Sequence, residues 1–196
     1  MSTNNVDTVR LAISSLRSPE EERADITVGF STTNKFLSRV IRFFTVGSVS
    51  HSWIAHNSED YRQRMVLQAE AWSFETRPWK RWLRENKWIA EYKYSGLYQI
   101  PSLQNTAKSL GLKYDWENGI LAGLLAWFRR WWGMKFSVRL RNTPGRVWCA
   151  EAVVRFLKEA GCDCVKNLDP ETVVPSELYD IVRTSPEFIA VRRREE

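Results

Sequence analysis

The sequence has few cysteines, few histidines and no long hydrophobic run. Its 196 residues include three cysteines and two histidines. An odd and sparse set of cysteines does not form the disulfide framework of a small secreted domain, and it indicates a reducing compartment. The most apolar run, from Gly119 to Phe128, is about half as long as a membrane-spanning helix. We therefore expect that run to form a buried or interfacial helix.

The N-terminal segment also lacks the continuous apolar core of a secretory signal. This absence favours a cytoplasmic protein, either a bacterial enzyme or a phage-encoded product that acts in the host cell. Residues 1–24 are polar and are expected to form an N-terminal arm. Residues 25–196 are expected to form one domain, because a chain of this length has enough interior for a single core.

The charge balance is moderately basic, with 29 Lys and Arg residues against 23 Asp and Glu, a net charge of +6. No basic-plus-aromatic nucleic-acid motif accompanies this excess, so no specific nucleic-acid partner is expected. Trp127, Trp131 and Trp132 do stand beside Arg129 and Arg130. Aromatic residues next to arginine are typical of interfacial membrane binding, and they also cover the edges of cores. Peripheral membrane contact is therefore one alternative for this segment.

Apolar residues alternate between strand spacing and helix spacing along the chain. Strands are expected at residues 25–31, 51–57, 64–72, 87–95 and 188–192, with an extended piece at 135–140. Helices are expected at residues 32–45, 78–86, 101–111, 116–133, 145–161 and 174–182, with a short one at 9–16. This mixed order predicts an α+β fold in which an antiparallel sheet packs against helices.

The helix expected from Gly145 to Gly161 carries Cys149 near its start. Gly161 is the residue type that most readily closes a helix in the left-handed conformation. In the first turn, the helix dipole and the unpaired amides lower the pKa of a thiol and help to form an oxyanion site. The alternative is a buried thiol that packs like a small hydrophobic residue.

The histidines are candidate bases for such a thiol. His51 and His56 are five residues apart, so on one regular strand they point to opposite faces. His51 stands at the start of its strand, close to a turn, where a side chain reaches a cleft. If the following hairpin turns near residues 59–60, His51 lies opposite Gln68, with Glu70 on the same face. Either residue can orient the imidazole, unless Glu70 is a solvated charge and Gln68 an ordinary strand residue.

The other two cysteines, Cys162 and Cys164, are separated by one residue. Such spacing is compatible with a metal site, but neither histidine lies nearby in the sequence, so no zinc site is expected. No other cofactor is expected either.

Several segments together carry a family resemblance that spans Asp25 to Val191. They are "DITVGFS", "FLSRVIRFFTVGSVSHSWIA", "VLQAEAWSFETRPW", "GLKYDW", "WCAEAVVRFLKEAG" and "VPSELY". These segments resemble the permuted papain-like cysteine amidases of the YiiX and YaeF type, within the NlpC-like superfamily. In that family the histidine strand precedes the cysteine helix, and this chain has the same order. The resemblance implies a circularly permuted papain-like (NlpC-like) fold.

The resemblance also implies roles for individual residues. The family has a Cys-Ser-Glu opening at its cysteine helix, matched here by Cys149, Ala150 and Glu151. Its histidine is matched by His51, and its third polar residue, a Glu in many members, is matched by Gln68. Glutamine can orient an imidazole but supplies no negative charge to an imidazolium.

The implied activity is that of a thiol-dependent amidase or peptidase, with acyl transfer or ester hydrolysis as variants. The implied substrates are peptides, cell-wall peptide bonds or acyl lipids.

Tyr114 and Asp115, in "GLKYDW", match a further family feature, where the tyrosine lines a cleft or the aspartate caps a helix. A different class remains open, namely a binding module that engages membrane or cell-wall polymer through a basic, Trp-rich surface.

Overall fold

The computed structural model describes residues 26–33, 36–45, 47–58, 61–70, 72–95, 99–132 and 145–193. The expected N-terminal arm, the short helix at 9–16 and the extended piece at 135–140 lie outside the described residues.

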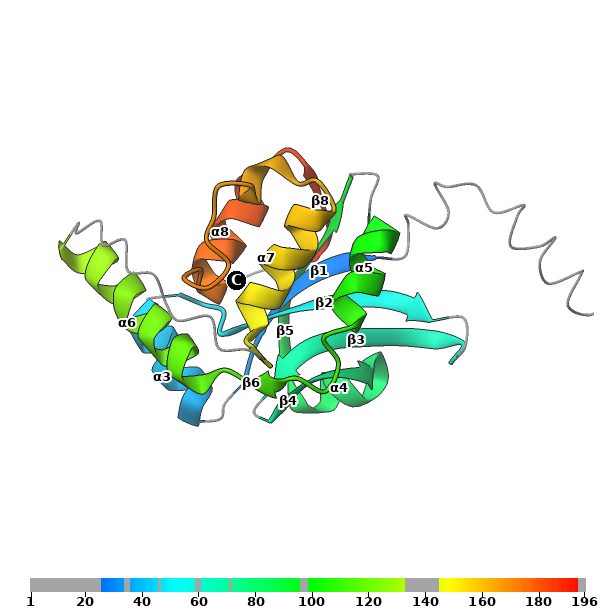
Figure 1. The fold of residues 1–196 in the computed structure, drawn as a ribbon, viewed down its shortest axis with the longest axis horizontal. Helices are drawn as coiled ribbons and strands as arrows, with labels where there is room; N and C mark the ends of the chain where they lie inside the picture. The colour runs from blue at the N-terminus through cyan, green and yellow to red at the C-terminus, as the bar shows by residue number, and fades with distance from the viewer. Residues whose placement is uncertain are drawn as a thin grey trace, which may run out of the picture.

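The core of the molecule is one curved sheet with the strand order β7-β6-β4-β3-β2-β1-β5-β8 (Figure 1). Its strands are β1 (Thr27–Thr32), β2 (His51–Ser58), β3 (Gln63–Glu70), β4 (Ser73–Pro78), β5 (Lys87–Tyr94), β6 (Lys113–Tyr114), β7 (Arg146–Val147) and β8 (Phe188–Arg193). Neighbouring strands are antiparallel except β6 and β7, which are parallel. The prediction of an antiparallel sheet is therefore wrong for the short pair of β6 and β7.

Helices surround the sheet and confirm the α+β class. They are α3 (Phe36–Thr45), α4 (Trp79–Glu85), α5 (Gln99–Ala107), α6 (Trp116–Trp132), α7 (Cys149–Glu159) and α8 (Pro175–Thr184), with a short 3-10 turn at Asp163–Val165. Strand β4 was not expected, because it is mostly polar, ends in proline, and buries only Phe74. Strands β6 and β7 are two residues each, too short to produce a pattern.

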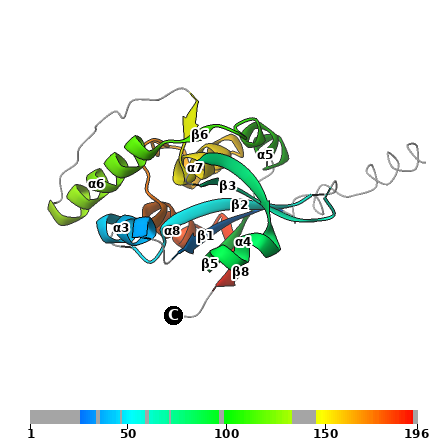
Figure 2. The ribbon, with the colours of Figure 1, turned by 90° about the horizontal axis from the view of Figure 1, so that it is seen from below.

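The two faces of the sheet carry different clusters. Helix α7 packs against β2, β3 and α5 over the larger core. A second cluster on the opposite face joins Trp53, Ala55, Val66 and Trp82 of α4. Figure 2 shows α7 and α5 on one side of the strands and α4 on the other. Gly29 lies opposite Trp53 across β1 and β2, and a Cβ there would collide with the indole ring. The sheet therefore needs glycine at this position.

Helix α7 begins at Cys149, later than the expected Gly145, because Arg146 and Val147 pair as β7 with β6. It closes as expected at Gly161, which has a φ of 81°. The Gly161 amide donates to Lys158 O at 3.0 Å, and the next amide donates to Leu157 O at 2.9 Å. These two bonds form a Schellman motif, which satisfies the last carbonyls of the helix.

Candidate active site

The hairpin of β2 and β3 places a histidine and a glutamine on one face. Ile54 lies opposite Leu67, so the pairing differs by two residues from the one expected, which set His51 against Gln68. Because side chains alternate with a period of two, a shift of two residues leaves every side chain on its face. Gln68 is therefore still on the face of His51, diagonal to it, and Glu70 also shares that face.

Cys149 is the first residue of α7, and its side chain is buried at 2% exposure. The thiol is hydrogen-bonded to His51, to the backbone amide of Ser52 and to the hydroxyl of Tyr114. Burial raises the pKa of this thiol, but the hydrogen bonds and the charge of His51 outweigh it and lower the pKa below its usual value. The site therefore favours a thiolate at Cys149.

The imidazole of His51 shows the reciprocal effect. Burial lowers its pKa, whereas the hydrogen bond and charge of Cys149, the hydrogen bond of Gln68 and the charge of Glu70 raise it, and the net shift is upward. A raised histidine pKa beside a lowered thiol pKa favours a thiolate–imidazolium pair. By contrast, burial lowers the pKa of His56, which stands on the opposite face of β2.

Gln68 is hydrogen-bonded to the imidazole nitrogen of His51 that faces away from Cys149. His51 Nε2 lies 3.0 Å from Gln68 Oε1, and the indole Nε1–H of Trp82 donates to the same oxygen at 2.7 Å. The amide nitrogen of Gln68 donates to Glu70 Oε2 at 2.9 Å. These contacts fix which end of the amide faces the ring, so Nε2 carries the proton and Nδ1 is left for the thiol.

Glu70, the other candidate partner of His51, stands behind Gln68. Its carboxylate accepts the bond from Gln68 and pairs with Arg77 at 3.2 Å. Arg77 also pairs with Glu75 and, at 2.7 Å, with Glu85. The polar chain thus runs from the imidazole through a neutral amide to a carboxylate and a guanidinium.

Tyr114 and Asp115 adopt separate roles at the start of α6. The hydroxyl of Tyr114 bonds to Cys149, and burial followed by the charge of Cys149 raises its pKa well above the usual value. The hydroxyl therefore stays protonated and acts as a donor. Asp115 accepts from the backbone amide of Asn118 at 3.2 Å and from its side-chain amide at 2.7 Å, which makes it a helix cap.

Trp82 was not expected at the site from the sequence, and Glu151 was expected only as part of the family's Cys-Ser-Glu opening. Trp82 lies in α4 and reaches Gln68 only because the chain folds α4 back onto β3. Glu151, in the first turn of α7, accepts the Trp148 amide at 3.3 Å and pairs with Arg155 at 2.6 Å. Burial raises the pKa of Glu151 to about 7, against the lowering effect of Arg155.

Metal-ligating side chains gather at the other end of α7. Cys162, Cys164 and Glu187 place their ligand atoms within 4.8 Å of one another, and this is the one such group found among the described residues. No metal site was expected from the sequence because neither histidine lies near the two cysteines. The third residue of the group is a glutamate instead. Glu187 was missed because it lies 25 residues after Cys162 in the sequence, in the turn before β8.

The aromatic segment of α6 lies partly on the surface. Trp131 and Trp132 are 63% and 61% exposed, and Phe43 of α3 is 71% exposed. A hollow between these helices is lined by Arg42, Phe43, Gly47, Trp127 and Trp131. The side chains of Arg129 and Arg130 lie outside the described residues. Within the described part of the chain, no helix is long and apolar enough to cross a membrane.

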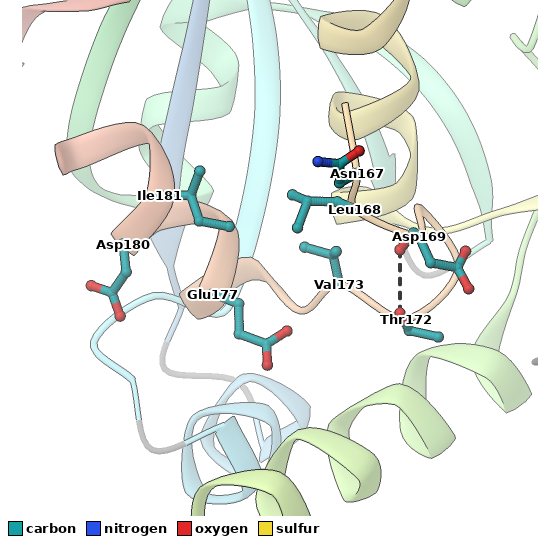
Figure 3. A pocket seen from close by; sticks show the side chains of 8 residues that line it. All are labelled: Asn167, Leu168, Asp169, Thr172, Val173, Glu177, Asp180 and Ile181. Atoms are coloured by element: carbon teal, nitrogen blue, oxygen red, sulfur yellow. Dashed lines mark hydrogen bonds between the residues drawn. The ribbon is translucent and has the colours of Figure 1, made fainter. Parts of the chain in front are cut away.

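Another pocket lies between α8 and the loop before it (Figure 3). Two of its acidic side chains accept hydrogen bonds from the backbone: Asp169 accepts from the Glu171 amide at 3.1 Å, and Glu177 accepts from the Val174 amide at 3.3 Å. Neither Cys149 nor His51 lines this pocket. It therefore offers no nucleophile paired with a base.

Comparison with known proteins gives a likeness in fold. No family model matches the chain, and no curated protein matches its sequence. The crystal structure of the metalloprotein YiiX from Escherichia coli O157:H7, a DUF1105 protein, superposes with a TM-score of 0.50 at 18% sequence identity. The match covers 87% of this chain and 96% of that chain. The chain therefore shares a YiiX-like α+β fold.

Proposed function

We propose that this protein is a cysteine hydrolase of permuted papain-like fold, with Cys149 as nucleophile and His51 as general base and acid. The observation that carries the proposal is the hydrogen-bonded pair of Cys149 and His51 at the start of α7, with the far imidazole nitrogen bound by Gln68. The chain order, histidine strand before cysteine helix, and the YiiX-like fold both support it.

In the first step, the thiolate of Cys149 attacks the carbonyl carbon of an amide or ester. The developing oxyanion is stabilised by the backbone amide of Cys149, unpaired in the first helical turn, and by the hydroxyl of Tyr114. The imidazolium of His51 gives its Nδ1 proton to the leaving nitrogen or oxygen. The carbon–nitrogen or carbon–oxygen bond breaks, and a thioester with Cys149 remains.

In the second step, water attacks the thioester carbonyl. The neutral imidazole of His51 takes a proton from the water, and the carbon–sulfur bond breaks to release the acid. The thiolate of Cys149 and the imidazolium are restored. Gln68 keeps the ring aligned through both steps. Because Gln68 is neutral, the thiolate supplies the main negative charge next to the imidazolium.

The proposed substrates are peptides, cell-wall peptides or acyl lipids with an accessible carbonyl. A second candidate function, binding to an anionic membrane or wall polymer, is favoured by the exposed Phe43, Trp131 and Trp132 near Arg42. Liposome or peptidoglycan sedimentation tests it. Binding that persists in Cys149→Ala and fails in a Trp131→Ala, Trp132→Ala double variant supports this second function.

The hydrolase is tested with purified full-length protein, an activated ester substrate and a thiol-directed acyl probe. Cys149→Ala should lose turnover and probe labelling. Cys164→Ala, which removes a half-buried thiol elsewhere on the molecule, is the matched control and should retain both. Equal labelling of Cys149→Ala and the unmodified protein contradicts the assignment of the nucleophile.

A further inference from the structure

We propose that Cys162, Cys164 and Glu187 form a binding site for a single zinc ion, separate from the proposed active site. The three residues come from the loop after α7 and from the turn before β8. Cys149 is the first residue of α7, at the opposite end of the helix. The proposal therefore stands or falls independently of the hydrolase.

The three side chains have the spacing of a zinc coordination shell. Cys162 Sγ lies 3.3 Å from Cys164 Sγ and 3.6 Å from Glu187 Oε2. Around a tetrahedral zinc ion, with bonds of about 2.3 Å to sulfur and 2.0–2.2 Å to oxygen, neighbouring ligand atoms lie roughly 3.5–3.8 Å apart. Small side-chain movements are enough to admit the ion between the three atoms.

The backbone holds this arrangement in place. The Schellman motif at the end of α7 positions Cys162, whose amide donates to Leu157 O. Both oxygens of Glu187 are held by backbone amides: Asp163 N–H donates to Oε1 at 3.1 Å, and Cys164 N–H donates to Oε2 at 2.9 Å. The carboxylate is thereby fixed beside both thiols. A preorganised site binds a ligand with a smaller entropic cost than a mobile one.

The charge around the group favours a cation. Within the described ranges, no lysine, arginine or histidine forms an ion pair with Glu187. The Asp163 carboxylate lies outside this group and pairs with the exposed Lys166 at 3.0 Å. Thiolates select soft or borderline metals, and the carboxylate oxygen favours zinc over copper(I). Three protein ligands leave the fourth position to water or to a fourth ligand.

The test uses Co²⁺ as a spectroscopic substitute for Zn²⁺. The protein is the full-length chain in the Cys149→Ala background, which removes the other thiol able to bind metal, and it is kept reduced by a phosphine. We expect the charge-transfer absorption of cobalt–thiolate bonds to saturate at one equivalent per chain. One equivalent of Zn²⁺ should then abolish it. Zn²⁺ should also raise the melting temperature.

Cys164→Ser should lose the cobalt absorption and the zinc-dependent rise in melting temperature. Cys164 is chosen because it is half-buried, whereas Cys162 is 1% exposed. Circular dichroism shows whether the variant is folded. Glu187→Gln should weaken Zn²⁺ binding at least tenfold, and Asp163→Asn should leave it within about twofold. No saturable absorption, or the same absorption in folded Cys164→Ser, overturns the proposal.

Discussion

The two ends of α7 place cysteines in opposite chemical surroundings. At the first residue, Cys149 faces hydrogen-bond donors from His51, Ser52 and Tyr114, and its pKa falls despite burial. Beyond the last residue, the Cys162 thiol donates a hydrogen bond to Cys164. This bond, burial, and the charges of Cys164 and Glu187 raise the pKa of Cys162, and the same bond lowers the pKa of Cys164. The helix dipole acts in the same two directions. Donors around Cys149 favour a thiolate, which the proposed nucleophile requires, whereas the second thiol and the carboxylate beside Cys162 supply the ligand atoms of the proposed zinc site.

Among the hydrogen-bond partners of Cys149, His51 lowers the pKa of the thiol the most, so replacing it should have the largest effect on activity. In His51→Ala, kcat/KM should fall about 10³-fold, within the range of 10²- to 10⁴-fold for a general base. The pKa of Cys149 should rise, because burial remains and the opposing bond and charge of His51 are gone. The rate of thiol alkylation should therefore increase at higher pH than in the unmodified protein. Alkylation rates of Cys149, measured across pH by mass spectrometry, check this shift.

The control for this variant is His56→Ala, which removes the histidine on the opposite face of the same strand. It should keep kcat/KM and the alkylation profile of Cys149. An unchanged rate in His51→Ala at neutral pH contradicts the assignment of the base.

The two ends of α7 also differ in the role of a tyrosine. Tyr114→Phe removes the hydroxyl that bonds to Cys149 and should lower kcat/KM about 100-fold, as for the loss of one oxyanion donor. Tyr94 stands near the other cysteines, and burial, followed by the charge of Cys162, raises its pKa to about 12. Tyr94→Phe is therefore the matched control and should leave kcat/KM unchanged. Equal losses in both variants would indicate a general structural effect instead.

The residues gathered at the Cys149 end of α7 were easier to predict from the sequence than those at the other end. Cys149, His51 and Gln68 could be predicted because a helix start and a hairpin each constrain where a side chain points. The predicted register of β2 and β3 was wrong by two residues, but His51 and Gln68 still share a face because side-chain direction repeats every two residues. Glu187 could not be predicted, because no periodic pattern links it to Cys162. Trp82 was also missed, since its contact depends on how α4 packs across the sheet.

The buried carboxylate at the start of α7 should make stability depend on pH. Burial raises the pKa of Glu151 from 4.5 to about 7, so the folded chain keeps a proton that the unfolded chain releases. The free energy of unfolding should therefore fall as the pH rises through this interval, by at most about 3 kcal/mol at 1.36 kcal/mol per pKa unit. Glu151→Gln does not titrate and keeps an acceptor for the Trp148 amide. Its stability relative to the unmodified protein should increase with pH.

Urea unfolding at about pH 5 and about pH 8 measures this difference. Glu159→Gln, an exposed residue at the opposite end of α7, is the control and should show the same pH dependence as the unmodified protein. A constant difference between Glu151→Gln and the unmodified protein at both pH values would contradict the role of Glu151.

The smallest expected effect concerns the residue that steadies the amide of Gln68. Trp82→Phe removes the indole donor to Gln68 Oε1 but keeps an aromatic ring against Trp53, whose centroid is 4.9 Å away. Gln68 should then hold the imidazole less firmly, and kcat/KM should fall about tenfold, less than the 100-fold loss that follows a misplacement of 1 Å. Trp79→Phe changes the ring stacked on Trp82 without touching this bond, and its kcat/KM should stay within about twofold. If both variants lose activity equally, packing under the sheet, and not the bond to Gln68, controls the histidine.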